Sequence, residues 1–364
     1  MMTRVVFMGS CPFARIILER LAKDFSICGV FTAPPKPKGR GYVLQNTCVH
    51  DYAQSMGWPV FTPSTFKDER AVLDLKSLSP SVAVVASYGL LLPQRVLDIP
   101  TAGCVNVHPS ILPRWRGASP LVYPILMGDQ QTGVAIMVMD AGMDTGPVLI
   151  QKSMPIAPDT TTELLGHQLA EMGAAALCDV LPDYLLGHLK PTPQGLEGVT
   201  LAPKISKDMG LLDCRNDAHQ LVRKVNALHP WPGTWLLIAG EKVTILKASA
   251  VDIPENPFTS GVLVDDASGD PKADLWHTPG HTQGTPGQAF KVASQHTAHA
   301  HPQISQAPHG IQDVLPGHII PWAQDWAVVC GQNTLLCPSV LRAPNGKIMD
   351  AGAFMRGYRA LLGL

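Results

Sequence analysis

Over the first half of the chain, short apolar runs alternate with longer segments of helical spacing. Residues 4–8 form a strand-like run, residues 12–23 have helical spacing with a proline near the start, and residues 26–32 are again strand-like. Further strands are predicted at 82–86, 103–108, 134–139 and 148–156, and helices at 50–56, 66–78 and 161–186. This alternation predicts an α/β fold with an open, doubly wound, Rossmann-like and mostly parallel sheet.

The pattern changes after residue 186. Residues 187–205 supply prolines and glycines without periodicity, which indicates a linker. Beyond it, helices are predicted at 217–228 and 351–362, and short β-like runs at 235–238, 242–248, 262–264, 327–330 and 334–341. Short strands separated by turns predict a small, OB-like β-barrel. We therefore expect an α/β domain over residues 1–186, a linker over 187–205 and a barrel domain over 206–364.

An insertion interrupts the second domain at about residues 265–320. It is rich in Gly, Pro, Gln, Ser and His, and contains seven of the thirteen histidines. Histidine is a common metal ligand, but neither regular ligand spacing nor a cysteine partner accompanies these residues. We expect a loop here and no metal site.

Composition narrows the class of protein. The 364 residues are 46% hydrophobic and 16% charged, which excludes a wholly disordered chain. A net charge of −1 excludes a globally basic nucleic-acid coat, so any polyanion site must be regional. Eight cysteines without a Cys-x-x-Cys pattern favour reduced thiols. The apolar runs at 5–8 and 82–92 are too short for a signal sequence or a membrane span, so we expect a soluble intracellular protein.

The residues with candidate chemistry follow two predicted strands. Asn106 and His108 are two positions apart at the end of a strand, so their side chains share one face. An amide beside an imidazole can polarise a carbonyl and stabilise an oxyanion. Asp140 and Asp144 lie in a later glycine-rich turn, and a carboxylate near His108 would favour the imidazolium. Each residue taken singly has a structural alternative. Asn106 could hydrogen-bond the backbone, His108 could lie in a polar core, and the aspartates could serve only the turn.

Together these segments resemble a known superfamily. Asn-Val-His at 106–108, Ser-Ile-Leu-Pro at 110–113 and Asp-Ala-Gly-Met-Asp-Thr-Gly at 140–146 resemble the 10-formyltetrahydrofolate-dependent formyltransferases and hydrolases. Within that superfamily, Pro-Arg-Trp-Arg-Gly-Ala at 113–118 and His-Pro-Trp-Pro-Gly at 229–233 are most similar to the methionyl-tRNA formyltransferases. The resemblance covers nearly the whole chain apart from the insertion.

The resemblance implies a reaction and the residues that perform it. The reaction is formyl transfer from 10-formyltetrahydrofolate to the α-amino group of methionine on initiator tRNA, without a metal. Asn106, His108 and Asp144 match the catalytic trio. The folate site is implied to comprise Gly89, Leu90, Leu91, Ser110, Ile111, Leu112, Pro113 and Asp140. For Leu90 and Leu91 a plain core role remains an alternative.

A tRNA substrate needs a basic docking surface. Lys36, Lys38 and Arg40 lie in a proline-stiffened loop whose position in the family meets the tRNA acceptor end, although a solvated basic loop would look the same. Arg114 and Arg116 could add phosphate contacts, or one could brace the folate loop. The basic docking surface could continue onto the second domain, or the charges there could be ordinary surface charge; the residues concerned are Lys204, Lys207, Arg223 and Lys224.

Pro109 departs from the pattern of the methionyl-tRNA formyltransferases, which usually have glycine there. His-Pro-Ser is typical of glycinamide ribonucleotide formyltransferases and of formyltetrahydrofolate hydrolase domains. A related enzyme acting on a small amine or on water is therefore an alternative, and a non-catalytic RNA-binding protein is an alternative of a different class. We expect a monomer in a bacterial cytoplasm, with an organelle as the other possibility.

Overall fold

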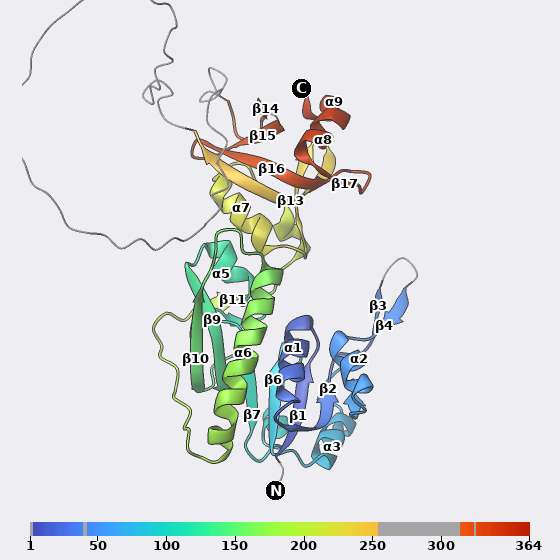
Figure 1. Cartoon of the computed structure of the whole chain (residues 1–364), viewed down its shortest axis with the longest axis vertical. Coiled ribbons are helices and arrows are strands. Elements are labelled where there is room, and N and C mark those ends of the chain that lie inside the picture. The colour runs from blue at the N-terminus through green and yellow to red at the C-terminus, as the bar shows by residue number, and fades with distance from the viewer. Residues whose placement is uncertain (1–2, 39–41, 254–313, 324) are drawn as a thin grey trace, which may run out of the picture.

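The computed structural model describes residues 3–38, 42–253, 314–323 and 325–364. In Figure 1 an α/β part carries the N-terminus, and a smaller strand-rich part carries the C-terminus. Arg40, the strand predicted at 262–264 and most of the insertion at 265–320 lie outside the described residues.

A seven-stranded sheet in the order β10-β9-β7-β6-β1-β2-β5 forms the centre of the α/β part. The pairs along β7-β6-β1-β2-β5 are all parallel, whereas β9 and β10 are antiparallel additions at one edge. The strands are β1 (Arg4–Gly9), β2 (Ser26–Phe31), β5 (Val60–Phe61), β6 (Val82–Ala86), β7 (Cys104–His108), β9 (Gln131–Val138) and β10 (Val148–Pro155). The predicted mostly parallel sheet is confirmed.

Helices cover both faces of this sheet. One face packs against α1 (Pro12–Leu21), α2 (Cys48–Ser55) and α6 (Thr162–Leu185), and the opposite face against α3 (Glu69–Ser77) and α4 (Gln94–Leu97). The side chain of Thr161 caps α6 by accepting a hydrogen bond from the Leu164 amide, as its place before the apolar pattern predicts.

The side chains of β7 alternate between the two faces of the sheet, and this places its polar residues on one face. Val105 and Val107 belong to the core that β7 shares with α1 and α6. Successive side chains of a strand point to opposite faces, so Asn106 and His108 point away from those helices. Toward the end of the strand, the buried cluster on that side consists of Leu112 and residues of β9, whereas α3 and α4 cover the beginning of the strand at Cys104.

The C-terminal part is a separate strand-rich domain, as predicted, and the paired strands of its sheet are antiparallel. Its six-stranded sheet has the order β12-β13-β16-β15-β14, with β17 also paired to β16. Trp326 and Phe354, whose ring centroids are 5.9 Å apart, lie in its core. The elements are η1 (Lys207–Gly210), α7 (Ala218–Ala227), β12 (Thr234–Ile238), β13 (Glu241–Asp252), β14 (Ile319–Trp322), β15 (Asp325–Cys330), β16 (Thr334–Arg342), β17 (Ile348–Asp350), α8 (Ala351–Gly357) and α9 (Arg359–Leu362).

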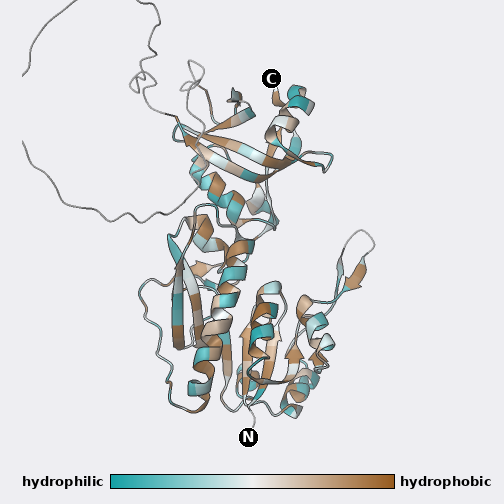
Figure 2. Ribbon diagram, in the orientation of Figure 1, coloured by the Kyte–Doolittle hydropathy of each residue, from teal (hydrophilic) through white to brown (hydrophobic). Residues whose placement is uncertain are grey.

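The two parts meet where α7 packs against α5 (Val122–Met127). The Thr162 hydroxyl donates to the Ala227 carbonyl at 2.6 Å, and the Asn226 amide donates to the Pro158 carbonyl at 3.2 Å. Figure 2 shows apolar strands within each part and polar residues on the outer faces of the helices. Each part therefore has its own core.

The contact between α6 and β7 gives a test of the fold. A Cβ on Gly173 of α6 would lie 2.6 Å from Cγ1 of Val107, closer than carbon atoms can approach. We expect Gly173→Val to lower the free energy of unfolding by about 1–3 kcal/mol because it overpacks this contact. Urea denaturation measures the free energy of unfolding of each variant. Gly357→Val, at a helical glycine with open space around it, is the matched control, and an equal loss in both variants would contradict the prediction.

Candidate active site

Asn106 and His108 lie side by side on β7, largely withdrawn from solvent. They are 9% and 3% exposed, and they pair with Met137 and Ala135 of β9. The Asn106 side chain makes no hydrogen bond to any other residue that the structure describes. A polar amide with little exposure and no partner from the protein is available to bind a ligand atom.

The imidazole of His108 lies between two oxygen atoms. Its Nε2 is 3.1 Å from the Trp115 carbonyl oxygen, and its Nδ1 is 3.7 Å from Oδ2 of Asp144. A carbonyl only accepts hydrogen bonds, so Nε2 carries a proton and donates it. The separation from Nδ1 to Asp144 exceeds a hydrogen bond, which leaves this edge of the ring for a water or a reacting group.

Burial and these neighbours act on the pKa of His108 in opposite directions. Burial disfavours the imidazolium and lowers the pKa of His108 below its usual range, and this effect is the largest. The carboxylate of Asp144 and the Trp115 carbonyl favour the imidazolium and oppose that shift. His108 is therefore neutral near pH 7, and its proton affinity depends on where Asp144 lies.

Asp144 and Trp115 both have a left-handed backbone, with φ of 52° and 62°. Such a conformation costs a residue other than glycine about 1–3 kcal/mol and persists only where the surroundings impose it. Oδ2 of Asp144 accepts a hydrogen bond from the Gly117 amide at 2.7 Å, and the Trp115 indole donates to Asp129 at 2.8 Å. These bonds fix the carboxylate and the carbonyl on either side of His108.

Two side chains of the linker also reach this site, and the sequence analysis missed both. The side-chain amide of Gln194 donates a hydrogen bond to the Asp144 carbonyl and accepts one from the Arg116 guanidinium. The Thr200 hydroxyl accepts a hydrogen bond from the Trp115 amide at 2.9 Å. The partners lie 50 to 85 residues apart, so no local spacing could reveal them. The linker is therefore part of the wall around the trio.

The Ser110–Pro113 segment forms a tight turn after β7. The Ser110 hydroxyl donates to the Arg114 carbonyl at 2.6 Å, and the Leu112–Pro113 peptide bond is cis. Leu112 is buried, and its carbonyl accepts from Gln151 at 2.9 Å. Ile111 is half-buried near Gly133. The turn thus lies directly beside His108.

The other residues proposed for the folate lie on neighbouring loops. Gly89 has φ of 82°, Leu90 is half-buried, and Leu91 is 89% exposed, which excludes the core alternative for Leu91. Met139 packs both against the cluster that Leu90 joins and against the cluster of Leu112, so these loops converge.

The carboxylate of Asp140 is used within its own turn. It accepts hydrogen bonds from the Gly142 amide at 3.0 Å and from the Thr145 hydroxyl at 2.7 Å. Asp140 thus shapes the turn that carries Asp144.

The basic residues fall into two groups. Lys36 and the main chain of Lys38 lie on β3 (Lys36–Lys38), which pairs with β4 (Val43–Gln45) in a hairpin that projects from the body in Figure 1. Arg114 pairs with Asp129 at 2.6 Å and stacks on Trp115, and Arg116 bonds Gln194. Both arginines are engaged within the chain, which favours the bracing interpretation.

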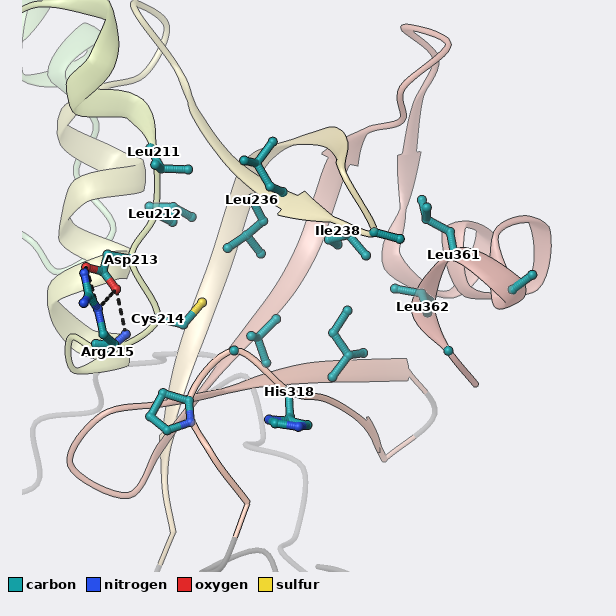
Figure 3. A pocket seen from close by; sticks show the side chains of 18 residues that line it. Leu211, Leu212, Asp213, Cys214, Arg215, Leu236, Ile238, His318, Leu361 and Leu362 are labelled. Atoms are coloured by element: carbon teal, nitrogen blue, oxygen red, sulfur yellow. Dashed lines mark hydrogen bonds and ion pairs between the residues drawn. The ribbon is translucent and has the colours of Figure 1, made fainter.

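Several hollows of the described surface lie outside the trio, and two of them are of similar volume. One, of about 740 Å³, lies between the two parts and is lined by Asp129, Arg223 and Lys247 among others. The other, of about 750 Å³, lies in the C-terminal domain. Figure 3 shows its leucine-rich wall, with Cys214 and His318 beside it. Neither hollow includes a member of the trio.

The described residues contain no group of three or more His, Cys, Asp or Glu side chains placed to hold a metal ion. Among the same residues, no helix is both long and apolar enough to cross a membrane. All eight cysteines are free thiols.

The sequence matches the formyl transferase family over residues 3–181 and its C-terminal domain over residues 204–270. The chain belongs to the formyl transferase family. A methionyl-tRNA formyltransferase of Paramagnetospirillum magneticum is 47% identical over 266 residues, which cover 72% of this chain and 86% of that protein. One of Myxococcus xanthus is 45% identical over 247 residues, covering 68% and 79%.

Solved structures agree with the fold. An N-formyltransferase of Helicobacter canadensis, in complex with folinic acid and dTDP-3-aminofucose, superposes with a TM-score of 0.57 at 13% identity. The match covers 93% of this chain and 99% of that one, so both parts of this chain have counterparts in that formyltransferase.

The geometry around His108 predicts how its pKa responds to a mutation. Asp144→Asn removes the negative charge that favours the imidazolium, so the pKa of His108 should fall further below its usual range. An NMR titration of the imidazole measures the shift. Asp179→Asn, on the exposed face of α6, is the control, and an unchanged His108 titration in Asp144→Asn would contradict the prediction.

The sign of the linked stability follows from the lowered pKa. His108 in the folded chain resists protonation, whereas in the unfolded chain it titrates near its ordinary value of about 6.5. Its contribution to stability is therefore fully present above that value and is lost as pH falls through the lower, folded pKa.

Proposed function

We propose that Asn106, His108 and Asp144 carry the transfer of a formyl group from 10-formyltetrahydrofolate to the α-amino group of methionyl-initiator tRNA. The observation that carries this proposal is the pairing of a free amide with an imidazole on one face of β7, with a fixed carboxylate 3.7 Å from the imidazole. The family membership and relatives of 42–47% identity named methionyl-tRNA formyltransferase support the reaction.

When bound, 10-formyltetrahydrofolate supplies the formyl group on its N10, the atom that is released when the acceptor amine takes the group. Negative charge then develops on the formyl oxygen. The Asn106 amide and the open Nδ1 edge of His108, once protonated, can donate hydrogen bonds to it. Because both groups are nearly excluded from solvent, these bonds are stronger than they would be in water.

Asp144 supports this step by transferring a proton near His108. The attacking amine must lose a proton, and Asp144 can accept it directly or through a water in the space beside Nδ1, and then pass it to N10 as the bond from N10 to the formyl carbon breaks. The hydrogen bond from the Gly117 amide holds the Asp144 carboxyl group in place beside His108. The chain's residues thus move a proton and stabilise an anion, and none needs to form a covalent bond to the substrate.

The loops around the trio fit a flat, polar ring system such as that of the folate. Gly89 leaves open space above its Cα, and its exposed neighbour Leu91 offers apolar surface. The turn that carries Asp140 presents main-chain groups on the other side. Ser110, Ile111, Leu112 and Pro113 complete the proposed folate site next to His108.

The acceptor tRNA would dock on the basic hairpin and along the space between the two parts. Lys36 is exposed on β3, and Arg223, whose Nε is buried with no partner among the described residues, lines the hollow between the parts with Lys247. Lys224 instead donates to the Leu211 carbonyl at 2.8 Å, so it supports the domain core. Pro109 is the departure that suggests small amines or water as acceptors, whereas the relatives named methionyl-tRNA formyltransferase support the charged initiator tRNA.

The boundaries at 186 and 205, a monomeric state and a cytoplasmic location are further parts of this proposal. The bacterial relatives support the cytoplasm.

Removing one member of the trio tests the chemistry. His108→Ala and Asp144→Asn should each lower kcat on charged initiator tRNA by roughly 10²–10⁴-fold, the range for a lost acid–base or oxyanion group. In the double variant, the fold-loss of kcat should be far smaller than the product of the two single losses, since the residues act as a unit. Asp179→Asn is the control.

Single-turnover assays with initiator tRNA, elongator tRNA, glycinamide ribonucleotide and water measure these rates and identify the acceptor. Near-normal turnover in either single variant would remove that residue from the mechanism. Preference for the ribonucleotide or for water would favour the competing acceptors.

The hairpin gives a test of tRNA docking. If Lys36 neutralises a phosphate, Lys36→Ala should reduce the slope of log binding constant against log salt by about one. Folate binding should not change. Lys23→Ala, an exposed lysine beyond α1, is the control, and an unchanged salt slope in Lys36→Ala would exclude this contact.

A further inference from the structure

The amide of Gln194 has its full set of hydrogen-bond partners, all of them beside the trio. Its Nε2 donates to the carbonyl oxygens of Asp144 at 2.9 Å and Gly146 at 2.7 Å. Its Oε1 accepts from Nε of Arg116 at 3.1 Å and from Nη2 at 2.6 Å. A carboxamide has two donor hydrogens and two acceptor lone pairs, so all four are used.

These partners fix which way the amide points. A guanidinium only donates hydrogen bonds and a carbonyl only accepts them, so the oxygen faces Arg116 and the nitrogen faces the turn. A carboxylate of the same shape could keep the bonds to Arg116, but it would place an oxygen against two carbonyl oxygens. The position therefore requires an amide rather than any polar side chain.

The linker holds both left-handed residues of the site. Beyond Gln194, the Thr200 carbonyl accepts from the Arg116 amide at 3.0 Å, and its hydroxyl accepts from Trp115. Strand β11 (Leu201–Ala202) then pairs in parallel with β8 (Arg116–Gly117). Gly117 is the residue whose amide binds the Asp144 carboxylate. The Asp144 turn and the β8 segment thus both lie against the linker.

We propose that Gln194 is a positioning residue for formyl transfer: it holds the main chain of Asp144 in the left-handed conformation that directs its carboxylate at His108. The inference rests on the proposed roles of His108 and Asp144. Gln194 lies beside the turn and acts through Asp144.

Two substitutions separate this role from bracing of Arg116. Gln194→Met keeps the length of the side chain and removes all four hydrogen bonds, whereas Gln194→Glu keeps an acceptor for Arg116 and loses the donors to Asp144 and Gly146. We expect both variants to lower kcat by about 10–100-fold, since a small misplacement of a catalytic group is enough for that loss. The KM values for folate and tRNA should stay within about twofold of the original. Gln168→Met and Gln168→Glu, on the exposed face of α6, are the matched controls.

A double variant distinguishes positioning from a general structural role. If Gln194 acts through the Asp144 carboxylate, Gln194→Met should cause little further loss of kcat in the Asp144→Asn chain. A full additional loss there, or normal kcat in Gln194→Glu, would overturn the proposal. A raised KM for folate at unchanged kcat would overturn it too, because that result would indicate a binding role.

A readout independent of turnover keeps this test separate from the proposed function. Displacing the Asp144 carboxylate removes a charge that favours the imidazolium, so the NMR pKa of His108 should fall in Gln194→Met as it does in Asp144→Asn. If Asp144→Asn retains full activity, the proposed mechanism fails while this titration still tests the positioning. An unchanged His108 pKa in a folded Gln194→Met chain would overturn the inference.

Discussion

The site depends on one constraint: β7 buries a hydrophobic face and an imidazole at the same time. Val105 and Val107 join the core with α1 and α6, so His108 is forced onto the opposite face of the strand, where it is only 3% exposed. A buried imidazole needs hydrogen-bond partners, and a buried imidazolium needs a negative neighbour as well. The Trp115 carbonyl and the Asp144 carboxylate meet these needs. The loops around the site are arranged so that these two oxygens reach the ring.

That constraint explains which parts of the structure the sequence could predict. The alternation of apolar runs with helical spacing is a local signal that predicts the sheet and the helices, and the i, i+2 spacing of Asn106 and His108 predicts their shared face. The contact between Asp144 and His108 is not local, since it depends on a left-handed turn after β9, and only the family resemblance identified it. Gln194 left no signal because its partners are 48 to 78 residues distant. The sequence also left open whether Arg114 and Arg116 bind partners within the chain, because a positive charge alone does not identify its partner.

The segment between the two parts has a dual role. As a linker it joins two separate hydrophobic cores, one around β1, β6 and β7 and the other around Trp326. It also extends the active site, since β11 pairs with β8 only a few residues before η1 begins the C-terminal domain. The segment that leads into the C-terminal domain is thus also the one that holds the Asp144 turn, so this domain is connected to the chain directly beside the candidate site.

The free energies of backbone strain and of hydrogen bonding indicate how firmly the Asp144 turn is held. The left-handed conformations of Trp115 and Asp144 cost about 1–3 kcal/mol each, whereas a single hydrogen bond contributes a net of about 0.5–1.5 kcal/mol. A single bond offsets only the lower part of that cost, and each of these residues receives bonds from more than one segment. Losing part of that set should let the turn relax while the cores remain intact, because neither strained residue contributes to the clusters around β7 and α6. The geometry of the site is therefore more sensitive to mutation than the fold that carries it.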